Sequence, residues 1–110
     1  MIDLHFHALP GLDDGPVTME ESVALCRRAA EEGTTHVVAT PHVLREPWLN
    51  EDPAARAALL AELNARLGGT PVVLPGCELM FSLDILELVE KGDDGPVVGL
   101  NGSSVLLVEF

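Results

Sequence analysis

Two histidines near the start of the sequence, His5 and His7, are spaced so that they can bind one metal ion. They alternate with apolar residues, and in an extended chain residues i and i+2 point to the same side. Asp13-Asp14-Gly15 follows a Pro10-Gly11 turn, which can bring carboxylates back toward the same place. The alternative for the histidine pair is two strand-end side chains with ordinary hydrogen bonds.

Three further candidates for metal binding follow or interrupt apolar segments later in the chain. His42 comes directly after residues 36–41, and Glu78 follows the valine- and leucine-rich residues 71–75. Taken alone, His42 could be a turn histidine and Glu78 a solvent-facing loop residue. Glu109 lies in the apolar final segment, where a carboxylate is costly to bury unless it is paired or metal-bound. A water-exposed position at the end of a strand would also accommodate it.

The elements that would carry these side chains alternate between strand and helix. Apolar, β-branched segments predict strands, and apolar residues at helical spacing predict helices. We expect strands at residues 2–6, 36–40, 71–75, 97–100 and 104–110, and helices from the Thr18 cap to about Glu32, at 53–67, and after Ser82. The order β-α-β-α-β-α-β-β indicates a single α/β domain with a parallel sheet.

Signals at the helix ends support this assignment. Thr18–Glu21 has the pattern of a capping box, and Asp52-Pro53 is a favoured helix start. Gly33, Gly68 and Gly92 are expected to end the three helices. In the third helix, Phe81 and Leu86 are expected to pack together, and Asn101-Gly102 predicts a turn.

In a parallel α/β fold the carboxyl ends of the strands meet at one edge, and ligands bind there. The candidates at or just beyond such ends are His5, His7, His42, Glu78 and Glu109. We therefore expect side chains from four strands to meet in one metal site. A mixed set of histidines and carboxylates suits zinc, manganese or iron, and two cysteines are too few for a structural zinc cage.

Several neighbouring residues carry open interpretations. Asp3 either orients a ligand histidine or simply starts a strand, and Asp13 is a further candidate ligand. Trp48 either lines the entrance of the site or covers a helix end. Gly76 would let the backbone pass close to a bound group. Cys77 has no base beside it in the sequence, which argues against a nucleophilic cysteine.

The composition excludes several classes of function. The chain has 110 residues, the length of one domain, and its 18 Asp and Glu against 6 Lys and Arg give a net charge of −12. Nucleic-acid binding and attraction to an anionic membrane both need a basic surface, which this balance lacks. No apolar run reaches the ~18 residues of a membrane span, and no export signal precedes the first strand. We expect a cytoplasmic protein with reduced cysteines and no membrane insertion, and an oligomer is compatible with the sequence.

Taken together, the motifs resemble those of the PHP (polymerase and histidinol phosphatase) superfamily of metal-dependent phosphoesterases. The matching segments are Ile2–His7, Leu9–Gly15, Glu20–Ser22, Val38–His42, Pro75–Glu78 and Leu106–Phe110. Within the superfamily they are most similar to the bacterial protein-tyrosine phosphatases of the CpsB/YwqE type, which accompany capsule and exopolysaccharide synthesis. The resemblance implies a distorted, TIM-like β/α barrel.

The resemblance also implies a site for up to three divalent metal ions, usually manganese, with iron or zinc as alternatives. The implied ligands are His5, His7, Asp14, His42, Glu78 and Glu109. His5, His7 and Glu78 would hold one ion. Glu78 would bridge to a second ion that Glu109 also binds, and Asp14 and His42 would hold a third. The implied catalytic residues are Asp14, His42 and Glu78.

The implied reaction is hydrolysis of phosphotyrosine by a metal-activated hydroxide, without a covalent cysteine intermediate. The implied partner is an autophosphorylating bacterial tyrosine kinase. The later histidine, the distal Asp-x-His pair and the phosphate-binding arginines of the family have no counterpart in residues 1–110. We therefore expect this chain to be the N-terminal part of a single PHP domain, with incomplete activity on its own.

Three alternatives remain open at this point. One is another PHP phosphoesterase, acting on a small phosphate ester such as histidinol phosphate, and a second is a non-catalytic metal-binding module. An amidohydrolase is the third, because a His-x-His pair after a first strand occurs there too. Asp13-Asp14-Gly15 and Thr40-Pro-His42 favour the PHP superfamily over the amidohydrolases.

Overall fold

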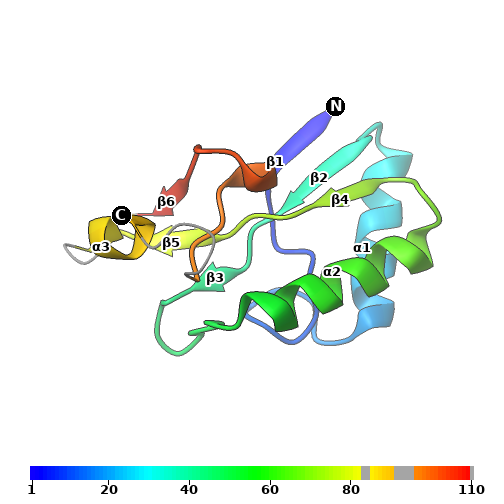
Figure 1. Ribbon diagram of the computed structural model, residues 1–110. Coiled ribbons are helices and arrows are strands. Elements are labelled where there is room, and N and C mark those ends of the chain that lie inside the picture. Colours follow the sequence, from blue (N-terminus) through cyan, green and yellow to red (C-terminus); the bar gives the residue numbers. More distant parts are fainter. Residues whose placement is uncertain (83–84, 91–95, 110) are drawn as a thin grey trace.

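The computed structural model describes residues 1–82, 85–90 and 96–109. Helices α1 (Met19–Glu31) and α2 (Pro53–Leu67) pack against the strands near the N-terminus (Figure 1). The short helix α3 (Ile85–Glu90) and the last strand lie at the end of the molecule remote from α1. None of the helices in the described part of the chain is long and apolar enough to cross a membrane.

The strands form two parallel three-stranded sheets. The first has the order β1-β2-β4 and consists of β1 (Ile2–Phe6), β2 (His36–Ala39) and β4 (Val72–Leu74). The second has the order β3-β5-β6 and consists of β3 (His42–Val43), β5 (Glu78–Met80) and β6 (Leu107–Glu109). Every pairing between these strands is parallel, which confirms the predicted parallel α/β class. The strands form two sheets, however, and not the one sheet that the sequence predicted.

Two strands of the first sheet lead almost directly into strands of the second. Thr40 and Pro41 separate β2 from β3, and residues 75–77 separate β4 from β5. Because proline has no backbone N–H to donate, it interrupts the hydrogen-bond ladder at both points. His42 and Glu78 therefore begin strands of the second sheet and pair in register with each other, a detail that the sequence did not predict.

The strand predicted at residues 97–100 is wrong. The backbone N–H of Val98 donates to the Sγ of Cys77 (3.4 Å), and the thiol donates to the Val98 carbonyl (3.2 Å). The backbone N–H and carbonyl of Val98 thus bond to a side chain instead of to a neighbouring strand. Residues Leu100–Gly102 then form a short 3-10 turn, in which Asn101 and Gly102 have φ angles of 54° and 71°. The predicted turn at these two residues is confirmed.

The helix ends follow the predicted capping residues. The Oγ1 of Thr18 accepts from the backbone N–H of Glu21 (3.2 Å), and the Glu21 carboxylate accepts from the backbone N–H of Thr18 (3.4 Å). Asp52 caps α2 by accepting from a backbone N–H in its first turn (3.0 Å), and Gly68 ends this helix with a φ of 68°. The capping box and both ends of α2 are thus confirmed.

Two predictions concern parts of the chain that the structure does not describe. The packing expected for Phe81 depends on the Leu86 side chain, and the end of the third helix depends on Gly92. The start predicted for the last strand is wrong, because β6 is Leu107–Glu109 and residues 104–106 do not belong to it; Phe110 lies outside the described residues.

The main core lies between the first sheet and helices α1 and α2. Its fully buried members include Cys26 from the predicted inner face of α1, Leu63 from α2, and Val37 from β2. A second, smaller cluster of Val43, Cys77 and Leu79 belongs to the second sheet. The junction of the two sheets therefore has a packed apolar cluster on each side.

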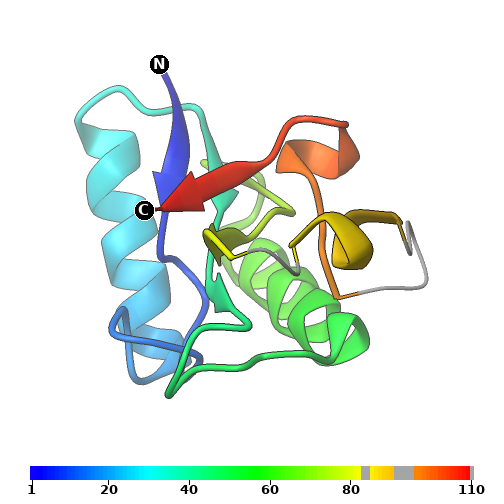
Figure 2. The ribbon, with the colours of Figure 1, turned by 90° about the vertical axis from the view of Figure 1, so that its left-hand side faces the viewer.

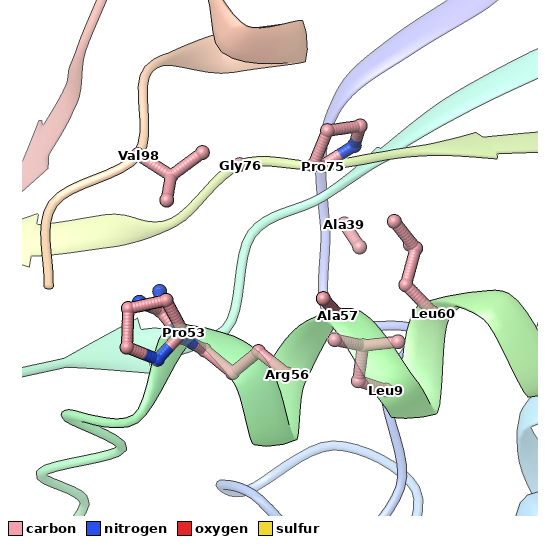
Figure 3. A pocket seen from close by; sticks show the side chains of 9 residues that line it. All are labelled: Leu9, Ala39, Pro53, Arg56, Ala57, Leu60, Pro75, Gly76 and Val98. Carbon is pink, nitrogen blue, oxygen red and sulfur yellow. The ribbon is translucent and has the colours of Figure 1, made fainter. Parts of the chain in front are cut away.

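Gly76 lies where the connection from β4 to β5 passes close to β2. A Cβ built on Gly76 would lie 2.8 Å from Cγ1 of Val38 and 3.2 Å from the carbonyl oxygen of Ala39. The glycine therefore allows close packing against a neighbouring strand. Beside it, α2 and Pro75 line an apolar cavity of about 210 Å³, and none of the residues that line this cavity is a predicted metal ligand (Figure 3).

We predict that Gly76→Ala destabilises the chain by about 1–3 kcal/mol, because the added methyl group would overpack the contact with Val38. The free energy of unfolding, measured by urea titration, tests this. Ala58→Ser on the exposed face of α2 is the control and should change that free energy by less than about 0.5 kcal/mol. Equal stability of Gly76→Ala and the unmodified chain would contradict the close packing.

Candidate metal centre

The side chains predicted as metal ligands lie together at the junction of the two sheets. They come from the carboxyl end of β1 (His5 and His7), the loop before α1 (Asp14), the starts of β3 (His42) and β5 (Glu78), and the end of β6 (Glu109). In the turned view, β6 lies in front of the sheet that contains β1 (Figure 2). The distances between the side chains place all of them in one cluster.

The first group consists of two imidazoles and a carboxylate. The Nε2 atoms of His5 and His7 are 3.2 Å apart, and Oε1 of Glu78 lies 3.2 Å from the first and 3.0 Å from the second. All three side chains therefore face one small volume, with their ligand atoms within 4.8 Å of one another. The resemblance implies this same trio for one ion, and the ligand role stays a prediction.

Two further groups share residues with the first. Nδ1 of His42 lies 3.5 Å from Oε1 of Glu78 and 3.4 Å from Oε1 of Glu109. Oδ1 of Asp14 lies 3.7 Å from Nδ1 of His7 and 3.7 Å from Nε2 of His42. The structure thus adds His42 to the expected Glu78–Glu109 pair, and adds His7 to the expected Asp14–His42 pair.

Asp13 orients His7, a role for which the sequence analysis considered only Asp3. The Asp13 side chain is 1% exposed, and its Oδ2 accepts from Nδ1 of His7 (2.9 Å) and from the backbone N–H of His42 (3.0 Å). Because Nδ1 donates to Asp13, the neutral His7 ring presents the lone pair of Nε2 to the cluster. Asp3 instead accepts from the backbone N–H of His5 (3.0 Å).

The sequence signal for this role was the Asp13-Asp14-Gly15 motif itself. Oδ1 of Asp13 accepts from the backbone N–H of Gly15 (2.9 Å), which closes a tight turn. A Cβ on Gly15 would lie 2.8 Å from the carbonyl oxygen of His7, so the glycine lets this turn pack against the end of β1. The turn directs the two neighbouring carboxylates to different parts of the cluster.

The contact between Asp13 and His7 sets the protonation of both groups. The hydrogen bond to Asp13 raises the pKa of His7 above its ordinary 6.5, although burial acts in the opposite direction. Burial by itself would raise the pKa of Asp13, but hydrogen bonds from His7, Gly15 and His42 outweigh it and hold that pKa below the ordinary 3.8. Asp13 is therefore ionised at neutral pH, and a proton and a metal ion compete for the His7 ring.

The residues of the cluster fit a divalent cation. Among the described residues, Nδ1 of His42 and Oε1 of Glu109 are buried atoms without a hydrogen-bond partner, which is costly for polar groups. Imidazole nitrogens and carboxylate oxygens are ligands that manganese, iron and zinc accept. A cation would satisfy both unpartnered atoms and would offset the negative charge gathered around them.

Three residues of the loop that follows β3 contact the cluster or its ligands, and of these only Trp48 was considered from the sequence, as a residue at the entrance of the site. The ring of Trp48 stacks on His42, with centroids 5.3 Å apart and planes 13° from parallel, so it covers a predicted ligand instead of a helix end. Nδ2 of Asn50 donates to the His42 carbonyl (2.7 Å). Nε of Arg45 lies 2.6 Å from Oε1 of Glu109. The only signal in the sequence was the nearness of these residues to His42.

We predict that the pKa of the His7 ring in the metal-free chain lies above 6.5. Mn²⁺ binding should weaken as the pH falls through that raised pKa, because a proton and the metal ion compete for the ring. Asp13→Asn should lower the His7 pKa, since it removes the ionised acceptor. Nitrogen-15 NMR of the histidine rings measures the pKa, and the electron paramagnetic resonance signal of free Mn²⁺ follows the binding.

Asp3→Asn is the matched control, because Asp3 contacts only the backbone N–H of His5 among the hydrogen bonds described for it. It should leave the His7 titration unchanged. The role given to Asp13 is wrong if both variants show the same His7 pKa as the unmodified chain.

Comparisons of this chain with known proteins all indicate the same family. The family model for capsular polysaccharide synthesis proteins of the CpsB/CapC type matches residues 1–110. The chain is 34% identical to the tyrosine-protein phosphatase YwqE of Bacillus subtilis and 33% identical to the tyrosine-protein phosphatase CpsB of Streptococcus pneumoniae. These alignments cover 100% of this chain but 43% and 45% of the two relatives, so the chain spans less than half of their length.

The fold is also similar to a solved structure. It matches, with a TM-score of 0.88 and 34% identity, a chain from the crystal structures of YwqE from Bacillus subtilis and CpsB from Streptococcus pneumoniae, which are described as unique metal-dependent tyrosine phosphatases. The match covers 100% of this chain and 44% of that chain. Because the family model matches the whole sequence, this chain belongs to the CpsB/CapC family of capsular polysaccharide synthesis proteins.

Proposed function

We propose that this chain is the metal-binding N-terminal part of a metal-dependent protein-tyrosine phosphatase that regulates capsule or exopolysaccharide synthesis. The observation that carries the proposal is the meeting of three histidines and three carboxylates in overlapping groups, namely His5, His7, Asp14, His42, Glu78 and Glu109. The similarity to YwqE and CpsB points the same way, since both relatives are named tyrosine-protein phosphatases.

The proposal includes the architecture of the domain. Residues 1–110 would be the N-terminal part of a single PHP domain, in the form of a partial, distorted β/α barrel. The parallel strands and the two helices packed on them support this. In such barrels the functional side chains lie at the carboxyl ends of the strands, as do His5, His7 and Glu109 here.

Manganese is the proposed metal, with iron or zinc as alternatives and up to three ions in all. One ion would be held by His5, His7 and Glu78. His42, Glu78 and Glu109 would hold a second, and Asp14 and His42, with His7 beside them, offer a third position. Bound ions would activate a water molecule and offset the charge of a phosphate ester.

The residues of the chain have separate tasks in this proposal. Asp14, His42 and Glu78 are the proposed catalytic residues. The Asp14 side chain is 62% exposed and can face a substrate, whereas His42 and Glu78 are each 7% exposed and are held in place by their surroundings. Asp13 keeps Nε2 of His7 directed into the cluster, and Trp48 excludes water from one face of His42.

The proposed substrate is phosphotyrosine in a protein, with an autophosphorylating bacterial tyrosine kinase as the partner. Because the chain has a net charge of −12, it would repel a phosphate unless cations are bound at the cluster. A cytoplasmic location is part of the proposal and agrees with the two buried, unpaired cysteines. An oligomeric state is compatible with it.

We predict that Glu78→Gln lowers both the number of bound Mn²⁺ ions and the affinity for those that remain, by about 10–100-fold, because its Oε1 belongs to two of the three groups. Metal analysis after equilibrium dialysis measures both quantities. Glu62→Gln on α2 is the control, since Glu62 is half exposed and pairs with Arg66. Unchanged metal content in Glu78→Gln would contradict the proposed site.

We also predict Mn²⁺-dependent hydrolysis of a phosphotyrosine peptide, which His42→Ala should slow by about 100-fold or more because a catalytic ligand is lost. Circular dichroism of the variant checks that it folds. Histidinol phosphate is tested in parallel. Faster hydrolysis of this compound than of the peptide would favour the alternative, a phosphoesterase that acts on a small phosphate ester. Full metal uptake with no hydrolysis of either compound would favour a non-catalytic metal-binding role.

A further inference from the structure

Arg45 is the basic residue that the structure brings to the metal cluster. The described part of the chain contains Arg27, Arg28, Arg45, Arg56 and Arg66. Arg28 and Arg66 pair with acidic residues of the helices, whereas Nε of Arg45 lies 2.6 Å from Oε1 of Glu109. Among the ion pairs of these arginines, that of Arg45 is the one that involves a candidate metal ligand.

A short hairpin holds Arg45 at this position. The backbone N–H of Leu44 donates to the Leu49 carbonyl (2.7 Å), and that of Arg45 donates to the Trp48 carbonyl (3.2 Å). The guanidinium carbon of Arg45 lies 5.5 Å from the centre of the Trp48 ring, and that ring stacks on His42. The hairpin thus holds Arg45 at the cluster, and the Trp48 ring beside Arg45 also covers His42.

The contact between Arg45 and Glu109 conflicts with the metal role of Glu109. Oε1 of Glu109 is the same atom that lies 3.4 Å from Nδ1 of His42 and belongs to a candidate metal group. Although Nε of Arg45 is close, the two atoms are not aligned for a hydrogen bond, and both are buried without such a partner. A cation bound at Glu109 would therefore compete with the guanidinium for this oxygen.

We propose that Arg45 binds the phosphate group of the substrate when Glu109 is engaged by a metal ion. Once Glu109 is taken, Arg45 has no other acidic partner among the ion pairs of the described residues. Its side chain is 31% exposed, so the guanidinium is in part open to solvent and can contact a ligand bound beside Glu109. Arginine presents a planar set of donors that matches two phosphate oxygens, and a nearby cation cluster draws the phosphate to the same place.

The inference rests on the proposed function, because it assumes a phosphate ester as the ligand of the metal centre. It adds an anion-binding residue that lies in the loop between β3 and α2. In this account Arg45 has two states. Without metal it offsets the charge of Glu109, and with metal it contributes to the recognition of the substrate.

Two binding measurements on the whole chain test this inference, and neither depends on catalytic turnover. Mn²⁺ affinity is measured in the absence of phosphate, and the affinity of the Mn²⁺-loaded chain for inorganic phosphate is then measured by calorimetry. Arg45→Ala should bind Mn²⁺ about threefold to tenfold more tightly, because a competing positive charge is removed. It should bind inorganic phosphate about tenfold or more weakly.

Two matched variants separate charge from geometry. Arg45→Lys keeps the charge but loses the paired donors, so its affinity for phosphate should lie between those of Arg45→Ala and the unmodified chain. Arg27→Ala, on the exposed face of α1, should change neither measurement. Circular dichroism checks that each variant folds.

The outcomes distinguish this inference from the proposed function. Unchanged phosphate affinity in metal-loaded Arg45→Ala overturns the role of Arg45 and leaves the metal centre intact. Weaker Mn²⁺ binding in the same variant also overturns it, because Arg45 would then only hold Glu109 in place. If the unmodified chain takes up no Mn²⁺, the proposed metal centre fails, and the inference about Arg45 fails with it.

Discussion

Negative charge gathered at the junction of the two sheets is the constraint on which the rest of this structure depends. Four carboxylates meet three imidazoles there, and like charges at this spacing repel one another strongly when they are withdrawn from water. The protein offsets only part of this charge. Asp13 is satisfied by three hydrogen bonds, and Oε1 of Glu78 by contacts with His5 and His7, whereas Oε1 of Glu109 is buried without a hydrogen-bond partner. A cluster that is neutralised in part by its own side chains is well suited to take up cations.

The backbone places these carboxylates by interrupting two parallel strands at the same level. Pro41 and Pro75 interrupt the hydrogen-bond ladder, and the chain resumes pairing at His42 and Glu78 in a second sheet. The interruption allows a histidine and a glutamate on neighbouring strands to face each other without leaving the folded interior. Gly76 makes the connection narrow enough to pass β2, so the geometry of the cluster depends on a residue that does not touch it.

A layer of contacts around the candidate ligands controls their orientation. Asp13 determines which nitrogen of His7 faces the cluster, and Trp48 covers one face of His42. Both contacts reduce the freedom of a side chain that would otherwise lose entropy on binding a metal ion. The hairpin that supplies Trp48 also supplies Arg45, so orientation of a ligand and delivery of positive charge come from the same short loop.

The sequence by itself determined the parallel α/β class, the capped ends of α1 and α2, and the candidates His5, His7, His42, Glu78 and Glu109, to which the family resemblance added Asp14. It could do so because these features depend on local signals: side-chain periodicity, capping residues, prolines, and polar residues placed after apolar strands. Only the tertiary structure decided which candidates share a volume, that Asp13 and not Asp3 orients His7, and that Trp48 and Arg45 reach the cluster. It also replaced the strand expected at residues 97–100 by a loop bonded to Cys77. Each of these outcomes depends on strand register and on contacts between residues far apart in the chain, and a local pattern reports the face of a strand but not the partner opposite it.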